Sequence, residues 1–157
     1  MGEVHFYHLT RNPVAAALGS LLPRCLDRGW RVAIRGTDPD RLRALDETLW
    51  LGPSDSFLPH GLAGGPHDAD QPILLTTGPA ANTPACLFCV DGADLASDDL
   101  APLERACILF DGRDEEAVAR ARTHWTALTD AGAAARYWSE ESGKWEQKAS
   151  KNVAAPA

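Results

Sequence analysis

Long hydrophobic runs and export signals are missing from this sequence, and both absences narrow the class of protein. In its 157 residues no window of about 18 apolar residues occurs, so we expect no transmembrane helix. The first residues, Met1–His5, carry neither the basic flank nor the apolar core of a secretion signal. The sequence therefore predicts a cytoplasmic protein, in which cysteine side chains stay reduced.

Positive charge is also scarce. The chain has 15 Lys and Arg residues against 22 Asp and Glu residues, which gives a net charge of −7. Broad contact with nucleic-acid phosphates requires clustered basic residues, so we expect little or no direct nucleic-acid binding. The segment 117–157 is the exception, with six basic residues against four acidic ones. This region could receive an acidic peptide, although a solvated surface is the commoner explanation.

Phosphate-binding motifs are absent as well. The turn Thr10–Pro13, after the first predicted strand, contains no Gly-x-Gly-x-x-Gly, so no backbone donors are set to approach a pyrophosphate. The Gly-rich segment Gly61–Gly65 precedes neither a Lys-Ser/Thr pair nor a helix, which favours a flexible loop over a phosphate cradle. We expect no cofactor.

Several residue types that serve in catalysis do occur. His60 lies near Ser54 and Asp55, but no Gly-x-Ser-x-Gly turn presents a nucleophile, and we expect His60 to hydrogen-bond its own loop. Asp91 and Asp111 each follow a predicted strand, where acids can be catalytic in α/β folds, although Asp-Gly is also an ordinary turn. An enzyme that uses a small molecule or a nucleotide therefore remains an alternative.

The four cysteines do not indicate a metal site. Cys86 and Cys89 have the spacing of a redox or metal pair, but no second pair and no nearby histidine accompany them. Their neighbours are apolar, which favours buried thiols on a strand.

Hydrophobic patterning predicts strands that alternate with helices. Strands are expected at 4–9, 30–35, 73–76, 85–90, 107–110 and 136–138, and helices at 13–29, 38–50 and 114–131. Asn12 can cap the first of these helices, with Pro13 at its first position. The pattern indicates a three-layer α/β sandwich with a mostly parallel central sheet and a Rossmann-like topology. We expect one domain over residues 1–147 and a disordered tail over 148–157, which is polar and then rich in Ala and Pro.

An apolar loop follows the second predicted helix. Loops usually carry polar turn residues, but this one keeps Trp50, Phe57 and Leu58. Such a loop either folds back onto the core or offers an apolar surface to a partner.

The third predicted helix combines an apolar stripe with a basic flank. The stripe Val118, Ala121, Trp125 and Leu128 should face the sheet, and Arg122, Thr126 and Thr129 lie along its flank. Arg120 points nearly opposite and should be solvated. Arg122 beside Trp125, near Arg136 and Lys144, could clamp a carboxylate, or it could simply cover the edge of the core with its aliphatic stem.

Taken together, these segments resemble the chi subunit family of bacterial DNA polymerase III. The segments that carry the resemblance are Phe6–Tyr7, Leu45–Trp50, Ser56–His60, Leu62–Gly64, the helix of Arg122 and Trp125 with Gly132, and the closing Trp145. The stretch from Leu45 to Gly64 is the most specific of them. Residues from about 65 to 106 match only in strand pattern.

The resemblance implies a non-catalytic accessory protein of the clamp-loader assembly. Family members link the polymerase machinery, through a psi subunit, to the acidic, Phe-ending C-terminal tail of single-stranded DNA-binding protein. The resemblance assigns partner docking to the loop of Trp50, Pro53, Phe57 and Leu58, for a psi-like subunit and a helicase-like repair partner. It assigns tail binding to Arg122, with Trp125, Thr126, Arg136 and Lys144 as neighbours.

One residue departs from the family pattern, because Thr126 stands where a further basic residue is expected. The tail site could instead recruit Arg136, Lys144 or Lys148. A third interpretation, direct binding of single-stranded DNA, would use the aromatic rings of Trp125, Trp138 and Trp145. It ranks last because the C-terminal region has an excess of only two positive charges.

Overall fold

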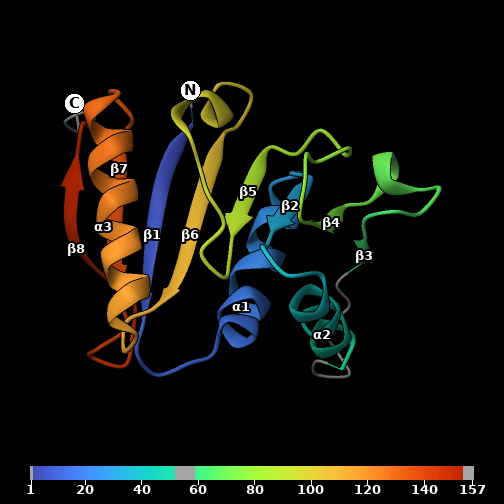
Figure 1. Cartoon of the computed structure of the whole chain (residues 1–157), viewed down its shortest axis with the longest axis horizontal. Coiled ribbons are helices and arrows are strands. Elements are labelled where there is room, and N and C mark those ends of the chain that lie inside the picture. The colour runs from blue at the N-terminus through green and yellow to red at the C-terminus, as the bar shows by residue number, and fades with distance from the viewer. Residues whose placement is uncertain (1, 52–58, 154–157) are drawn as a thin grey trace.

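A single sheet forms the middle layer of the protein (Figure 1). The structure is a computed structural model, and it describes residues 2–51 and 59–153. In these residues eight strands pair in the order β3-β4-β2-β5-β6-β1-β7-β8, and every neighbouring pair is parallel except β7 and β8. The strands are β1 (Glu3–Leu9), β2 (Val32–Arg35), β3 (Gly61–Leu62), β4 (Ile73–Thr76), β5 (Cys86–Cys89), β6 (Arg105–Asp111), β7 (Ala135–Ser139) and β8 (Glu146–Lys151).

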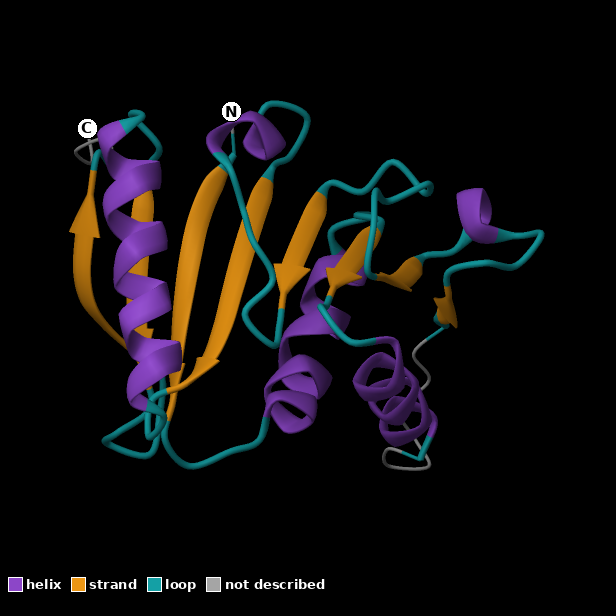
Figure 2. Cartoon of the chain, in the orientation of Figure 1, coloured by secondary structure: helices purple, strands orange, loops and turns teal. Residues whose placement is uncertain are grey.

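Helices cover both faces of this sheet (Figure 2). They are α1 (Val14–Asp27), α2 (Pro39–Trp50) and α3 (Glu115–Asp130), with short 3-10 turns η1 (Asp68–Asp70) and η2 (Ser97–Leu100). Leu18 of α1 and Leu42 of α2 join one core cluster, and Leu128 of α3 joins a second cluster on the opposite face. The predicted three-layer α/β sandwich is therefore confirmed. No helix in the described part of the chain is long and apolar enough to span a membrane.

The helix ends follow simple capping rules with one exception. Asp38 and Asp114 accept hydrogen bonds from the first-turn amides of α2 and α3, as aspartate caps do. Gly29 follows α1 with φ +78°, a conformation that suits glycine. The sequence predicted that Asn12 caps α1, but Pro13 holds the cap position without a side-chain bond. Asn12 instead donates its side-chain amide to Glu140.

Glu140 fixes the turn between β1 and α1. One carboxylate oxygen accepts the backbone N–H groups of Thr10, Arg11 and Asn12 at 2.9, 2.7 and 2.9 Å, and the other accepts the Asn12 side chain at 2.9 Å. Glu140 is 3% exposed. The turn that receives a pyrophosphate in dinucleotide-binding folds is thus filled by the protein's own carboxylate.

Two strands lie where the sequence predicted irregular chain. Gly61 and Leu62 form β3 beside β4, although a flexible loop was expected. Disorder was predicted from Lys148 onward, but residues 148–151 belong to β8, so that prediction is wrong there. Backbone pairing with β7 orders this polar segment, and the Asn152 side chain ties its end to the carbonyls of Thr129 and Ala133.

Candidate functional site

The apolar stripe of α3 packs on the sheet as predicted. Ala121 and Leu128 are buried, and Val118 and Trp125 pack against the same core cluster. The indole of Trp125 meets the ring of Phe6 edge-on, with centroids 5.3 Å apart. Trp125 is therefore held rigidly, with part of its ring left at the surface.

Arg122 lies exposed beside this aromatic cluster. Trp125 also meets Tyr137 of β7, with ring centroids 6.1 Å apart. Arg122 lies three residues before Trp125 on α3, a spacing at which side chains are neighbours on the helix surface. Burial raises the pKa of Tyr137, and the positive charge of Arg122 counteracts that rise. Thr126 is exposed one turn further along α3. We call Arg122, Trp125, Thr126 and Tyr137 the α3 flank.

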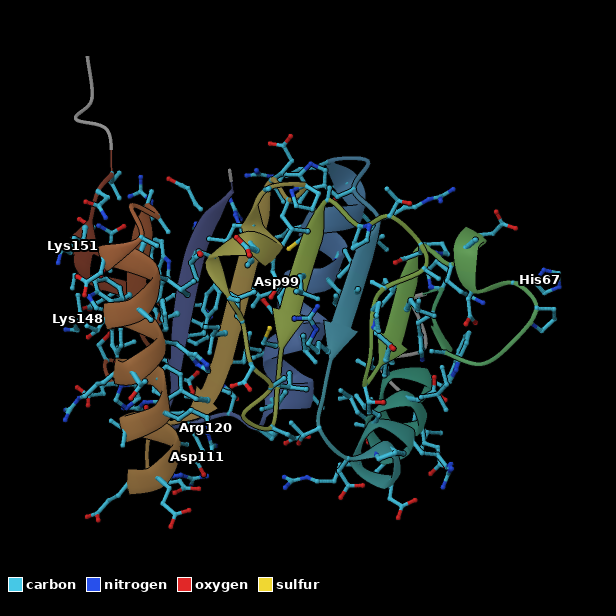
Figure 3. The ribbon with its side chains drawn as sticks, turned by 45° about the horizontal axis from the view of Figure 1, so that its top comes forward. His67, Asp99, Asp111, Arg120, Lys148 and Lys151 are labelled. Atoms are coloured by element: carbon cyan, nitrogen blue, oxygen red, sulfur yellow. The ribbon has the colours of Figure 1, made fainter. Side chains whose placement is uncertain are left out.

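Strand β8 adds positive charge next to the α3 flank (Figure 3). Lys151 of β8 pairs with Ala135 of β7, and Ala135 is buried under α3. Since residues paired across neighbouring strands share a face, Lys151 lies on the same face of the sheet as α3. Lys148 lies at an irregularity in the pairing, and its ammonium group is 3.1 Å from Glu146. Lys151 was not among the predicted site residues, because the polar sequence of this segment predicted a disordered tail.

Arg136, one of the residues predicted to join Arg122, lies elsewhere. Arg136 alternates with Tyr137 along β7 and therefore points to the opposite face of the sheet. There it contacts Glu3 at 3.5 Å and donates to Gln147 at 2.9 Å. Lys144 is exposed in the turn before β8, and its place at the tail site stays a prediction.

At the other end of the molecule, α2 terminates in an exposed apolar pair. Trp50 is 53% exposed and Leu51 is 85% exposed, and they are the large hydrophobic side chains that stand out among the described residues. The Trp50 ring stacks on the imidazole of His60 at 4.1 Å between centroids. Pro53, Phe57 and Leu58, the other predicted docking residues, lie outside the described residues.

His60 contacts the helix α2. It is buried, and its Nε2 lies 3.1 Å from the backbone oxygen of Asp46 and 3.3 Å from the Asp46 carboxylate. It therefore binds α2, and the predicted bond to its own loop, of which residues 52–58 lie outside the described residues, stays a prediction. Through this contact the ring that supports Trp50 is fixed to the helix.

Asp91 and Asp111 are the acids of the alternative hypothesis that the protein is an enzyme. They line a cavity that His60 does not line. Asp91 pairs with Arg41 at 3.1 Å and Asp111 pairs with Arg113 at 3.2 Å, and all four residues border this cavity. His60 is at the far end of α2, so the described structure does not gather it with these acids. Cys86 and Cys89 are buried free thiols on β5, as predicted.

The tryptophans proposed for stacking on DNA bases do not share a surface. Trp125 packs with the α3 cluster, whereas Trp138 and Trp145 pack against the cluster on the opposite face. A base-stacking platform requires aromatic rings along one groove. The structure therefore offers no support for the third interpretation.

The fold belongs to the class of Rossmann-like α/β domains. Residues 1–136 match the model of the family described as DNA polymerase III chi subunit, HolC. Since this match covers most of the chain, the protein belongs to the DNA polymerase III chi subunit family.

One relative supports the same assignment. A probable DNA polymerase III subunit chi of Rickettsia prowazekii (strain Madrid E) is 29% identical over 76 residues. The match covers 48% of this chain and 46% of the relative, so the chain spans about half the length of the curated relative that it matches.

Proposed function

We propose that the protein is a non-catalytic accessory subunit of the DNA polymerase III holoenzyme in DNA replication. In this role it bridges the clamp-loader assembly to the acidic C-terminal tail of single-stranded DNA-binding protein. Membership of the chi family supports the role. The proposal that the α3 flank binds the tail is supported chiefly by the exposed Arg122 beside the packed ring of Trp125. The role implies a cytoplasmic location at the replication machinery.

The α3 flank has the chemistry that a Phe-ending acidic tail requires. The guanidinium of Arg122 can hold the terminal carboxylate bidentately. The terminal Phe ring can pack on the partly exposed rings of Trp125 and Tyr137, which already pair edge-on. Upstream acidic residues of the tail would run toward Lys148 and Lys151 on β8.

The expected affinity is modest. A charge-assisted contact to Arg122 contributes about 1.5–3 kcal/mol, and the Phe ring adds about 1.5–3 kcal/mol. The costs of association offset several kcal/mol of such gains. A dissociation constant in the micromolar range follows, which suits a contact that is made and broken during replication.

Trp50 belongs to a second proposed surface. The exposed Trp50 and Leu51, continued by the predicted docking residues Pro53, Phe57 and Leu58, would bind a psi-like clamp-loader subunit or a helicase-like repair partner. A large aromatic side chain fixed by stacking on a buried histidine is typical of an interface anchor. The helices α3 and α2, which carry the two surfaces, lie toward opposite ends of the sheet (Figure 1), so both partners could bind together.

A titration with a fluorescent acidic peptide that ends in Phe tests the tail site. We expect wild-type protein to bind at micromolar concentrations and Arg122→Gln to weaken binding about tenfold or more, since a charged hydrogen-bond donor is lost. Arg120→Gln is the matched control, because it removes the same charge two residues away on another side of α3. Equal binding by the wild type and Arg122→Gln would rule out this site.

A second pair of variants compares the contributions of Lys151 on β8 and Lys144 in the β7–β8 turn to peptide binding. We expect Lys151→Gln to weaken peptide binding about two- to fivefold, as an exposed ionic contact would, and Lys144→Gln to have no effect. The effect of Lys151→Gln should shrink as salt is added, because exposed charges are screened. The measurement is the same titration at low and high ionic strength. The reverse order of effects would place the acidic part of the tail near the β7–β8 turn instead.

A further inference from the structure

A cavity lies at the carboxyl edge of the sheet, away from the α3 flank and from Trp50. It encloses about 370 Å³, within the usual range of small-molecule sites. Its walls come from the ends of β1, β5 and β6 and from the first turns of α1 and α3.

The position of the cavity follows from the chain topology. β1 and β6 are neighbours in the sheet, but β1 continues into α1 on one face and β6 continues into α3 on the other. The two connections diverge and leave a crevice between them. In open α/β sheets such a crevice, at the carboxyl ends of the strands, is where ligands bind.

The floor of the cavity is apolar. Buried side chains at the strand ends form it, namely Cys89, Ile108 and Phe110. Small residues of the neighbouring segments, Ala93, Ala117 and Ala121, leave the space above it open. A heterocyclic ring can pack on this apolar floor.

Among the described residues at the mouth of the cavity, Arg120 is available to pair with an anionic ligand. Arg41 and Arg113 are already paired with aspartates, and the Asp114 carboxylate caps its own helix. Arg120 also lines the cavity, and no ion pair or hydrogen bond engages its guanidinium in the part of the chain described. It lies across Gly92, where a Cβ atom would collide with it. Figure 3 shows Arg120 and Asp111 close together at this edge.

Further polar groups of the cavity lack partners. The Nδ1 atom of His124 is buried without a hydrogen-bond partner, and the histidine lines the cavity from α3. On the opposite wall, the first turn of α1 has no acidic residue and no side-chain cap, so the Val14 amide remains a donor. An anion would be attracted to both Arg120 and this helix end.

We propose that this cavity binds a nucleoside monophosphate. The base lies on the floor of Cys89, Ile108 and Phe110, with a ring substituent at His124. The single phosphate is held by Arg120 and the first turn of α1. A dinucleotide is disfavoured, because Glu140 already occupies the donors of the β1–α1 turn that would receive a pyrophosphate.

Saturation-transfer NMR and amide-shift titrations with AMP, GMP, CMP and UMP test the proposal, with adenosine and inorganic phosphate as partial ligands. We expect saturable binding of at least one nucleotide, at least about tenfold weaker binding of both partial ligands, and a loss of about tenfold in Arg120→Gln. Shifted amides should include those of Gly92, Asp111 and Ala117. Ala117→Leu, which fills the cavity, should also lose binding.

Arg122→Gln is the control, since it should impair the acidic-peptide site and leave nucleotide binding unchanged. The proposal is wrong if no nucleotide saturates the wild type at millimolar concentration. It is also wrong if Arg120→Gln and Ala117→Leu both bind nucleotide like the wild type, or if phosphate alone binds as tightly as a nucleotide. Because the peptide titration uses the other arginine of α3, failure here leaves the proposed replication role standing.

Discussion

Replacement of Trp50 by alanine is expected to weaken binding of the clamp-loader partner about thirtyfold or more, with little loss of fold stability. Tryptophans at the centre of interfaces commonly contribute 2 kcal/mol or more to binding, which is about thirtyfold in affinity. The indole is 53% exposed in the isolated chain, so its removal uncovers little core. Surface-plasmon resonance against the purified partner gives the affinity, and urea unfolding gives the stability.

The stability measurement decides between the two roles of this region. If Trp50→Ala lowered the free energy of unfolding by about 3 kcal/mol or more, the ring would be part of the core and not an interface anchor. Arg122→Gln is a suitable control, because it alters the opposite side of the molecule and should leave this partner's affinity unchanged.

Replacement of Glu140 by glutamine is expected to cost about 3 kcal/mol of folding stability. The carboxylate accepts four hydrogen bonds from Thr10, Arg11 and Asn12 while almost fully buried. A neutral amide oxygen is a weaker acceptor, and its NH₂ group would face the donor of Asn12. Urea unfolding measures the loss, and Glu141→Gln, an exposed neighbour, should change stability by no more than about 0.5 kcal/mol.

The contribution of the Glu140 carboxylate to folding stability should decrease at low pH. Burial is the largest single influence on the pKa of Glu140 and raises it, but the hydrogen bonds from Asn12, Arg11 and Thr10 together outweigh burial and hold the pKa below the usual 4.5. A carboxyl group with a lowered folded-state pKa stabilises the fold above its unfolded-state pKa, and this contribution is lost as pH falls through the folded value.

The stability difference between wild type and Glu140→Gln should therefore be largest near neutral pH and shrink below about pH 4.5. Unfolding curves of both proteins across that range check it. A difference that stays constant with pH would mean that the charge of Glu140 does not hold the turn.

Much of the fold could be predicted because hydrophobic patterning is local. The apolar stripe of α3 and the aspartate caps at Asp38 and Asp114 are set by neighbours a few residues away. The contact between Asn12 and Glu140 joins residues 128 positions apart, so the sequence could not show that the carboxylate would compete for the predicted cap. The polar strand β8 was missed for a related reason, because its order comes from pairing with β7 and not from its own composition.

The candidate site was predictable only in part. Arg122 and Trp125 were placed together by helical spacing, and the structure brings them together with Tyr137. Arg136 was grouped with them by proximity in the sequence, although the two-residue alternation of a strand puts it on the face opposite Tyr137. Lys151 could be assigned only once β8 was known to pair beside α3.

Affinity capture from the source cell, with mass spectrometry of the bound proteins, tests the central claim of a two-sided adaptor most directly. We expect wild-type protein to recover both clamp-loader subunits and single-stranded DNA-binding protein. Trp50→Ala should lose the clamp-loader subunits and keep the single-stranded DNA-binding protein, while Arg122→Gln should show the opposite pattern. Recovery of neither partner by the folded wild type, or loss of both by each variant, would contradict the two-surface account.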